Sequence, residues 1–508
     1  MEVKNKDTNQ KQKEDDRASA KMKEEEPYRP FDYLKNDPEK ESILNHIREC
    51  HKLVPTPQKV AEYFKMLQSG ERLKMLAGGI FLSTLCDELQ NKYFEPFFDE
   101  IGNPALLDTI IELIKTSKED YLRADLARVI GKLTFDSEEK IKILVDRGVI
   151  ELYIDTLKTE DVNLKLVDKL LHGIGNIACN ETSHVVKMLD LGLIDLLKKL
   201  FERVYTDSEP IHPVVSRIIW VMTIVIRRGI EQDIVVHLAP LVDKVFKRIL
   251  KERKYGEEFT SKVLKYCLFV FFNSCVVSKI LFIESLNITK DLIFLFKEKI
   301  YSRLEEPILE TCFEVLDYFM RQKGKILQSV IDNGIIDCVL YILEHKTALQ
   351  LREYGCICLC NLVVFDRGQV QAILDKKGLI EHFFGIMTED EVDVKRMAVK
   401  TLRNLVKRVN DDQLGFLIRE NLIEVYSNLL GACDDIQTVK LVLESIKIVL
   451  KHVVEMSGLQ RGSYIPLCGK LERIGVKEKL FELSKSPDDS TKSLATKILT
   501  KYFNCELE

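Results

Sequence analysis

Three features that point to common classes of protein are missing from this sequence. The formal net charge is only −5 over 508 residues, so no strong overall field favours nucleic acid. The N-terminus lacks the charged segment followed by an apolar one that marks a secretory signal. The most apolar stretch, residues 266–283, is interrupted by Asn273 and Lys279 and falls short of the roughly 20 apolar residues of a spanning helix. We expect no membrane insertion, and we expect this stretch to form a pair of buried helices.

Motifs of catalysis, cofactor binding and metal binding are missing as well. There is no HExxH, no phosphate loop and no nucleophile elbow, and the 13 cysteines are scattered without the spacing of a disulfide framework. Cys356, Cys358 and Cys360 are close in sequence, but on a helix the middle side chain faces away from the other two, so core packing is expected. The segment GIGNIA at 173–178 matches a dinucleotide pattern in its letters but follows no strand. The sequence therefore predicts a protein without enzyme activity or cofactors, in a reducing compartment.

The sequence does have helical apolar spacing, which begins near residue 51 and continues almost to the end. Prolines mostly fall between the apolar runs, and no segment alternates convincingly as a strand would. Residues 1–27 hold seven Lys or Arg, eight Asp or Glu and few large apolar side chains, a composition typical of disorder. We therefore predict an all-α fold preceded by a largely disordered arm over residues 1–50.

A repeat with spacings from 43 to about 49 residues runs through this helical region. Its marker is the Asn of the segment GNIACN, and an Asp mostly follows fourteen positions later, with a Gly two or three residues beyond. The marker positions are Lys132, Asn176, Asn273, Tyr318, Asn361 and Asn404, with a less certain one near Ile224. The glycines are Gly148, Gly192, Gly334 and Gly378.

Glycine readily takes a left-handed backbone, so each of these residues is predicted to turn the chain between two short helices. A longer third helix then carries the marker. A period in the forties with two or three helices is typical of armadillo or HEAT repeats. We predict a right-handed superhelix of about ten units over residues 51–505, with an extended concave surface and an acidic tail at 506–508.

Four segments resemble those of one family. GIGNIACNETSHVVKMLDLGLIDLL is similar to the armadillo unit of importin-α (karyopherin-α), and REYGCICLCNLVVFDRGQVQAILDKKGLI matches one of its later units. QTVKLVLESIKIVLKHVVE resembles the penultimate repeat of the family, and TKSLATKILTKYFNCELE resembles its last helix. The resemblance covers about residues 60–505.

The resemblance implies a nuclear import adaptor that binds the basic localisation signals of cargo proteins in its concave groove. It also implies a link to importin-β, recycling by an export receptor, and shuttling between cytoplasm and nucleus. In that family, Trp residues on the third helices form slots for lysine stems, and an Asn one turn later binds the peptide backbone. Trp offers cation–π attraction and an amide can pair with both an N–H and a C=O.

This chain departs from that pattern at most of the paired positions. They read Arg128/Lys132, His172/Asn176, Trp220/Ile224, Phe269/Asn273, Glu314/Tyr318, Ile357/Asn361 and Lys400/Asn404. Trp220 is the only Trp, and its place within IIWVMTIVI favours the core. Arg128, Lys132 and Lys400 should repel lysines. The candidate residues for binding cargo peptide are His172, Asn176, Trp220, Asn273, Glu314, Asn361 and Asn404, although isolated Asn residues can also cap or solvate helix ends. The alternative function is a scaffold that binds other extended protein segments, in the manner of catenin-like armadillo proteins.

The N-terminal arm gives a first prediction. The family binds importin-β through a strongly basic segment that also competes for the groove, whereas residues 1–27 carry seven basic against eight acidic residues, a net of −1. Deleting residues 1–27 should therefore leave the affinity for a lysine-rich peptide nearly unchanged in calorimetric titration. A gain of about tenfold or more on deletion would contradict this.

Overall fold

The computed structural model describes most of the chain outside the arm. The described ranges are residues 57–88, 103–136, 138–228, 232–252, 257–278, 288–302, 306–322, 324–345, 348–365, 367–432, 435–457 and 466–505, with the single residues 41, 42 and 45. Within them the elements are α-helices, and none is a strand. Apart from those single residues, the predicted arm at 1–50 lies outside the described residues, as does the predicted tail at 506–508. The chain divides into two compact units, Met1–Lys279 and Ile280–Glu508.

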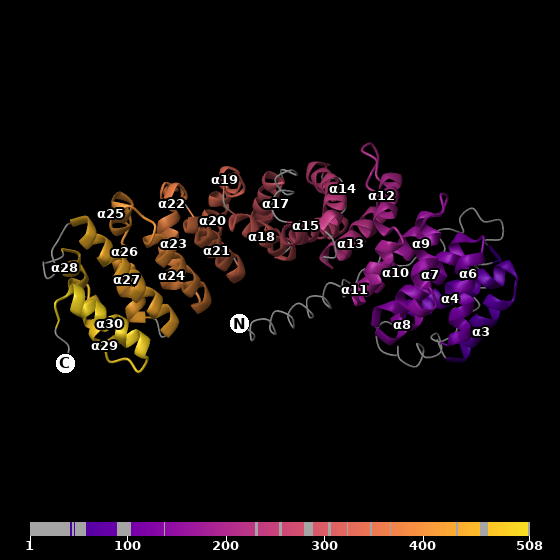
Figure 1. Cartoon of the computed structure of the whole chain (residues 1–508), viewed down its shortest axis with the longest axis horizontal. Coiled ribbons are helices and arrows are strands. Elements are labelled where there is room, and N and C mark those ends of the chain that lie inside the picture. Colours follow the sequence, from indigo (N-terminus) through magenta and orange to yellow (C-terminus); the bar gives the residue numbers. More distant parts are fainter. Residues whose placement is uncertain are drawn as a thin grey trace. The chain divides into compact units, whose positions relative to one another are not determined.

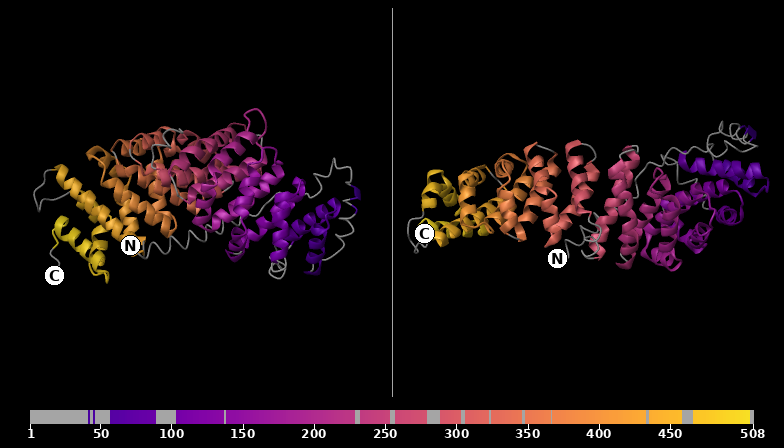
Figure 2. Two further views of the ribbon diagram at one scale, coloured as in Figure 1. Left: turned by 45° about the vertical axis from the view of Figure 1, so that its right-hand side comes forward. Right: turned by 90° about the horizontal axis from the view of Figure 1, so that it is seen from above.

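In the first unit, five long helices pack side by side, and all but the first of them carry a marker position (Figures 1 and 2). They are α4, α7, α10, α13 and α15, each in contact with the next. The remaining helices of the unit pack against them. The bounds are α3 Pro57–Gln68, α4 Arg72–Glu88, α6 Pro104–Thr116, α7 Asp120–Asp136, α8 Glu138–Asp146, α9 Val149–Leu157, α10 Leu164–Asn180, α11 Thr182–Asp190, α12 Leu193–Val204, α13 Pro213–Arg227, α14 Gln232–Glu252 and α15 Glu257–Ser278.

The second unit repeats the arrangement, and its long helices α18, α21, α24, α27 and α30 also pack each against the next (Figure 1). We call the long helices of both units the third helices. The bounds are α17 Thr289–Ser302, α18 Glu306–Met320, α19 Lys325–Asp332, α20 Ile335–Glu344, α21 Leu349–Phe365, α22 Arg367–Leu374, α23 Leu379–Glu389, α24 Val392–Val406, α25 Asp411–Arg419, α26 Leu422–Ala432, α27 Ile436–Ser457, α28 Pro466–Arg473, α29 Val476–Leu483 and α30 Asp489–Tyr502.

The predicted glycine corners are confirmed. All four glycines have φ between 78° and 96° and immediately precede the second helix of their repeat. Two corners escaped the sequence analysis. Gly475 has φ 81° before α29, and Asn421 has φ 71° before α26. Asn is one of the few residues with a side chain that tolerates this backbone, which is why a search for glycine alone missed Asn421.

The middle of the chain departs from the repeat. Between the third helices α13 and α15, the described residues form one helix of 21 residues, α14, which contains Pro240 and no glycine. Of the stretch 266–283 predicted to form a pair of helices, residues 266–278 belong to one helix, α15. The rest of that stretch lies outside the described residues. The apolar run is long because α15 packs against both α13 and α14.

No single helix in the described ranges is long and apolar enough to cross a membrane. Together, α19 and α20 reach the required length and composition, but the pair is bent by 53°.

Close packing between helices of one repeat provides a stability test. A Cβ at Gly173 in α10 would lie 2.5 Å from a ring carbon of Tyr153, whose side chain is fully buried in α9. Gly173→Ala should therefore lower the free energy of unfolding by about 1–3 kcal/mol through overpacking. Gly385→Ala in α23 is the matched control, because no neighbouring atom lies within 4 Å of its Cβ position. That change should be neutral or stabilising by up to about 1 kcal/mol. Chemical denaturation followed by circular dichroism measures both, and equal effects would contradict the packing argument.

Candidate functional site

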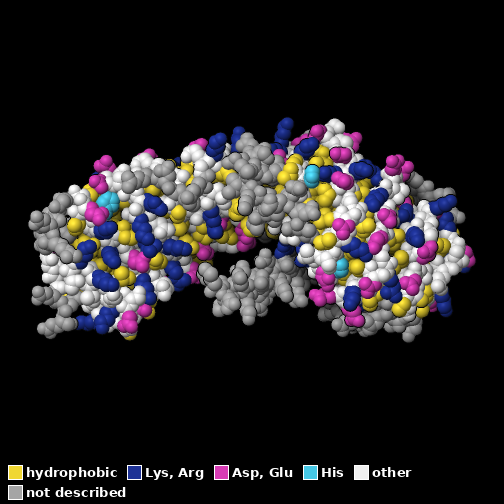
Figure 3. Space-filling view, in the orientation of Figure 1, with side chains coloured by type: hydrophobic (Ala, Val, Ile, Leu, Met, Phe, Trp, Pro, Cys, Tyr) yellow, Lys and Arg dark blue, Asp and Glu magenta, His cyan; other side chains and the backbone are white. Residues whose placement is uncertain are grey.

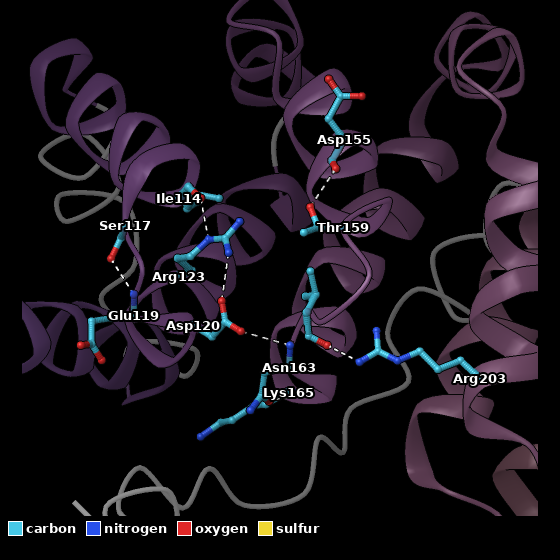
Figure 4. Close-up of polar contacts among 11 residues, drawn as sticks. Ile114, Ser117, Glu119, Asp120, Arg123, Asp155, Thr159, Asn163, Lys165 and Arg203 are labelled. Carbon is cyan, nitrogen blue, oxygen red and sulfur yellow. Dashed lines mark hydrogen bonds and ion pairs between the residues drawn. The ribbon is translucent and has the colours of Figure 1, made fainter.

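The N-terminal ends of the third helices are tied together by polar contacts between repeats (Figure 4). Asp120, the first residue of α7, accepts a hydrogen bond from the backbone N–H of Asn163 at 3.1 Å and pairs with Arg123 at 2.9 Å. Asn163 in turn caps α10 by accepting from the N–H of Lys165 at 2.8 Å. Arg123 also donates to the carbonyl of Ile114 in α6 at 2.7 Å. One carboxylate therefore fixes the start of two third helices in adjacent repeats.

In the second unit the same edge carries a series of ion pairs. A basic residue in the first turns of one third helix binds an Asp just before the next: Arg352 with Asp390 at 2.6 Å, Arg396 with Asp435 at 2.9 Å, and Lys440 with Asp488 at 3.0 Å. We call these the edge pairs. Asp435 and Asp488 also cap α27 and α30 by accepting from the N–H groups of Thr438 and Thr491.

The pKa values of the edge carboxylates follow from these contacts. The hydrogen bond from Arg396, followed by those from Thr438, lowers the pKa of Asp435 to about 2. The hydrogen bonds from Thr491, followed by that from Lys440, lower the pKa of Asp488 to about 2. Burial acts against a low pKa in Asp390, but Arg352 outweighs it and holds that pKa below its ordinary value. All three are ionised at neutral pH.

The middle of the third helices carries the predicted peptide-binding residues, and in the first unit three of them lie together. The ring centroids of His172 and Trp220 are 5.9 Å apart, and the ring of Trp220 packs onto α10 where Gly175 has no side chain. A Cβ there would lie 2.1 Å from the ring. Asn176 lies one turn beyond His172, and all three side chains are partly exposed. Trp220 is therefore neither in the core, as its apolar neighbours predicted, nor an open slot.

Arg217 changes what Trp220 can bind. Its guanidinium carbon lies 5.2 Å from the centre of the Trp220 ring, within the range of a cation–π contact. Arg217 also pairs with Asp168 of α10 at 3.1 Å, and Lys169 pairs with the same carboxylate at 3.1 Å. Burial would raise the pKa of Asp168, but Arg217 and Lys169 outweigh it and hold that pKa well below its usual range. The chain's own cation thus occupies the position that a cargo lysine would take on the ring.

The structure corrects the expectation about Arg128 and Lys132. Their side chains are only 3% and 7% exposed, so neither presents an open charge to a ligand. Long alkyl stems can be buried along apolar helix surfaces, and the sequence pattern could not show this. Lys400, by contrast, is exposed on α24 as predicted.

Three of the predicted Asn residues bind the preceding third helix. Asn176 donates to the carbonyl of Gly131 at 2.9 Å and to the Oγ1 of Thr134 at 3.3 Å. Asn361 donates to the Oδ1 of Asp317 at 2.6 Å, and Asn404 donates to the Sγ of Cys360 at 3.4 Å. Asn273 differs, because it donates to the carbonyl of Phe269 within its own helix at 2.7 Å. The partners of the first three lie 42 to 45 residues earlier, so the repeat period itself could have identified them.

These bonds decide what each amide can still offer to a peptide. An amide NH2 has two hydrogens and its oxygen accepts. Asn176 uses both hydrogens, which leaves only its oxygen as an acceptor. Asn361 and Asn404 each use one hydrogen, so each keeps a donor and an acceptor on a side chain whose orientation is fixed by the bond already made. We call Asn361 and Asn404 the late pair. Because each keeps both a donor and an acceptor, the late pair is better prepared than Asn176 to bind an extended backbone.

Acidic side chains surround the late pair on its N-terminal side. Glu310, Glu314 and Asp317 lie on α18, and Asp317 binds both Asn361 and, at 2.6 Å, Arg321. Tyr354 of α21 stacks on Phe313 of α18 with ring centroids 3.9 Å apart. Its hydroxyl donates to Glu310 at 3.4 Å. Of these residues, only Glu314 was predicted from the sequence. The missed signal was helical spacing: Glu310 lies four residues before Glu314, Asp317 lies three residues after it, and Tyr354 lies three residues before Ile357.

The cysteines of α21 lie as expected for core residues. Cys356 is fully buried and Cys358 is 1% exposed. Burial raises the pKa of Cys356 to about 12. Such thiols are protonated at neutral pH and take part in packing.

Comparisons with known proteins agree with this arrangement. No family model matches the chain. Importin subunit alpha-1 of Caenorhabditis elegans is 21% identical over 188 residues, which are 37% of this chain and 34% of that protein. Importin subunit alpha-8 of Mus musculus is 29% identical over 140 residues, which are 28% of this chain and 26% of that protein. The chain therefore matches about a third of the length of the first of these relatives and about a quarter of the second.

Two solved structures are similar over most of the chain. An engineered protein has a TM-score of 0.64 at 17% identity, with 87% of this chain and 98% of that chain covered. The second structure concerns a conserved phosphorylation switch that controls the interaction between cadherin and beta-catenin. It has a TM-score of 0.58 at 13% identity, with 87% of this chain and 82% of that chain covered. At these identities the likeness shows the fold.

The fold defines an all-α solenoid of armadillo repeats. The chain is a divergent armadillo-repeat protein whose sequence similarity is to importin-α subunits.

The edge pairs predict a pH-dependent contribution to stability. Asp435→Asn keeps an oxygen that can cap α27 but removes the charge that pairs with Arg396, so it should lower the free energy of unfolding at pH 7 by roughly 0.5 kcal/mol, as for a partly exposed pair. A carboxylate with a lowered pKa stabilises above its unfolded pKa of about 3.9, and this contribution is lost as the pH falls toward about 2. The difference between the wild type and Asp435→Asn should therefore shrink between those two pH values. Asp435→Ala, which also removes the cap, should cost about 1 kcal/mol more at pH 7. Urea denaturation over this pH range checks both expectations, and a pH-independent difference would contradict the ion-pair argument.

Proposed function

We propose that this chain binds extended segments of partner proteins across its third helices and acts as an import adaptor of the importin-α type. Asn361 and Asn404 carry the proposal. They stand at matching positions on adjacent third helices, and each keeps a free amide hydrogen and a free oxygen among the described residues. The sequence similarity to two importin subunits supports the transport role.

The spacing of the third helices suits an extended ligand. Packed helices lie about 8–10 Å apart, and an extended chain rises about 3.3 Å per residue. A segment that crosses from α21 to α24 therefore brings every third residue, roughly, beside a new helix. An amide at each crossing can hold the backbone whatever the side chain, which is how one surface serves several partners.

A basic cargo signal has a place to bind in the second unit. Glu314 lies one turn before Asp317, the residue of α18 that binds Asn361, and Glu314 is exposed. Glu310 lies one turn earlier and contacts Tyr354 of α21. Carboxylates at these places can pair with lysines that flank the backbone held by Asn361. Under this proposal the protein is a binding adaptor and not an enzyme, its cargo carries a basic signal, and it shuttles between cytoplasm and nucleus.

The proposal extends to two further partners by similarity to the family. Importin-β would carry the loaded adaptor, and an export receptor would return it. The segment expected to bind importin-β falls within residues 1–50, where only the single residues 41, 42 and 45 are described. A pull-down of importin-β with the full chain tests this part separately from cargo binding.

The second candidate function is a scaffold for other extended segments, without transport. The contact between Arg217 and Trp220 favours it, because the single Trp of the chain already faces a cation. In the structure noted above, beta-catenin interacts with cadherin, so an armadillo array without transport is a reasonable alternative. If the full chain binds an extended peptide but does not pull down importin-β, the scaffold function is favoured.

The adaptor proposal predicts an ordered set of affinities. The double change Asn361→Ala and Asn404→Ala should weaken binding of a lysine-rich localisation peptide by about tenfold or more, because each site loses roughly 1 kcal/mol of hydrogen bonding. Asn176→Ala is the matched control and should weaken binding less, because both of its amide hydrogens already bind the preceding helix. Calorimetric titration measures both, and circular dichroism confirms that each variant is folded. If the Asn176 variant lost most of the affinity and the double variant none, the early third helices would be the working site.

A further inference from the structure

Positive charge gathers on two adjacent third helices of the second unit, on a surface not predicted as a separate site. We call it the basic face: Lys400 and Arg403 on α24, Lys407 at the C-cap of α24, and Lys447 and Lys451 on α27. Lys400, Lys407 and Lys451 are exposed, and the other two are partly exposed. Figure 3 shows Lys and Arg side chains gathered over this end of the second unit.

The positions of these residues follow from helix geometry and from the repeat. Lys400, Arg403 and Lys407 are spaced by three and four residues, so they lie along one side of α24. Lys447 and Lys451 stand 44 residues after Arg403 and Lys407, at the same place on α27. The helices pack against each other, and Arg403 pairs with Glu444 across them. The five cations therefore lie on the same side of two adjacent helices.

Most of this charge has no acidic partner. Glu444 pairs with Arg403, and Glu455 pairs with Lys451 at 3.4 Å on an exposed part of the helix. Within the described ranges, Lys400, Lys407 and Lys447 form no ion pair. Three lysines in one patch repel each other unless an anion lies between them. Such an arrangement is stabilised by a negatively charged ligand.

The environment of Lys407 agrees with this reading. Burial lowers its pKa, and the nearby cations Arg403 and Arg408 lower it further, although Glu444 acts in the opposite direction. A carboxylate bound beside Lys407 would offset the repulsion from the nearby cations and stabilise the charged form of the lysine.

The charge is confined to one part of the unit. The residues that match Lys400, Arg403 and Lys407 in the α18 repeat are Glu314, Asp317 and Arg321, and Arg321 pairs with Asp317. On α21 the residues that match Arg403 and Lys407 are Cys360 and Val364. The second unit is thus acidic on α18 and basic on α24 and α27. A basic segment whose backbone is held by Asn361 and Asn404 can place its lysines beside α18, but lysines that continue over Lys400, Lys407 and α27 would be repelled.

We propose that the basic face binds an acidic, extended segment of a partner protein, with carboxylates spaced about three residues apart. This rests on the proposed segment-binding function and specifies its ligand over α24 and α27. The spacing follows from helices about 8–10 Å apart and an extended rise of about 3.3 Å per residue. Asn404 lies within the face, and its free amide groups can hold the backbone between two carboxylates.

A protein segment fits this face better than nucleic acid does. The chain as a whole carries a formal charge of −5, which disfavours a long polyanion. Glu444 and Glu455 also interrupt the positive surface. A peptide can place neutral residues opposite these carboxylates, whereas a phosphate backbone carries charge at every step.

The test is titration of the full chain with three short peptides of one length. One has Glu at every third position with Gly and Ser between, one has Gln in place of Glu, and one has Lys in place of Glu. We expect the Glu peptide to bind at least about tenfold more tightly than the Gln peptide, with an affinity that falls as salt is added. The triple variant Lys400→Glu, Lys407→Glu and Lys447→Glu should remove that preference.

A matched variant separates the face from the net charge. Lys325, Lys377 and Lys485 are exposed on other parts of the same unit and form no ion pair among the described residues. Changing these three to Glu alters the total charge by the same amount and should leave binding of the Glu peptide within about threefold of the wild type. Equal losses in both triple variants would overturn the proposal, as would failure of the wild type to prefer the Glu peptide.

The remaining outcomes separate this inference from the adaptor proposal. If a lysine-rich localisation peptide fails to bind while the Glu peptide binds and depends on the basic face, the import role fails and the acidic-ligand inference stands. If only the lysine-rich peptide binds, the basic face is not a ligand site and the inference is wrong. If a single-stranded oligonucleotide binds more tightly than the Glu peptide and needs the same lysines, the face is a nucleic-acid surface and the inference is again wrong.

Discussion

The burial of each third helix against the next is the interaction on which the rest of this structure depends. Side chains such as Leu166, Leu170 and Ile177 on α10 are fully buried, and α10 packs between α7 and α13. No repeat could cover its own apolar side, so a repeat is stable only when it is stacked against its neighbours. Within each of the two units, this requirement sets the order of the third helices, and their order places one face of a repeat beside the same face of the next. Binding chemistry is then a matter of which polar residues that shared face carries.

Much of the fold could be predicted from the sequence, because the period and the left-handed corners have direct signatures. The spacing of the Asn markers and four glycines located the repeats. The undivided helix α14 could not be located, since Pro240 in an apolar pattern reads as a boundary and not as a residue inside a helix. Asn421 was missed because a left-handed Asn looks like any other loop residue in print.

The site was less predictable, since side-chain partners depend on rotamers and burial. The pattern placed Asn361 and Asn404 on matching faces, but only the structure shows that each uses one hydrogen to hold the preceding helix. Likewise, the sequence assigned Arg128 and Lys132 to the groove, and their burial shows that a charged residue at a groove position need not present its charge. Arg217 beside Trp220 could have been suspected from their spacing of three residues on one helix.

The edge pairs give the repeat array of the second unit a direction. Asp435 and Asp488 each cap the start of one third helix and form an ion pair with an Arg or Lys on the third helix before it. When a repeat is lost from the C-terminal side, the Arg or Lys of the repeat before it loses the carboxylate that it bound in the next repeat. When a repeat is lost from the N-terminal side, the next helix keeps its cap. In a chain of coupled neighbours, the two ends are therefore not equivalent, and local opening of the array is easier to stop at one end of a repeat than at the other.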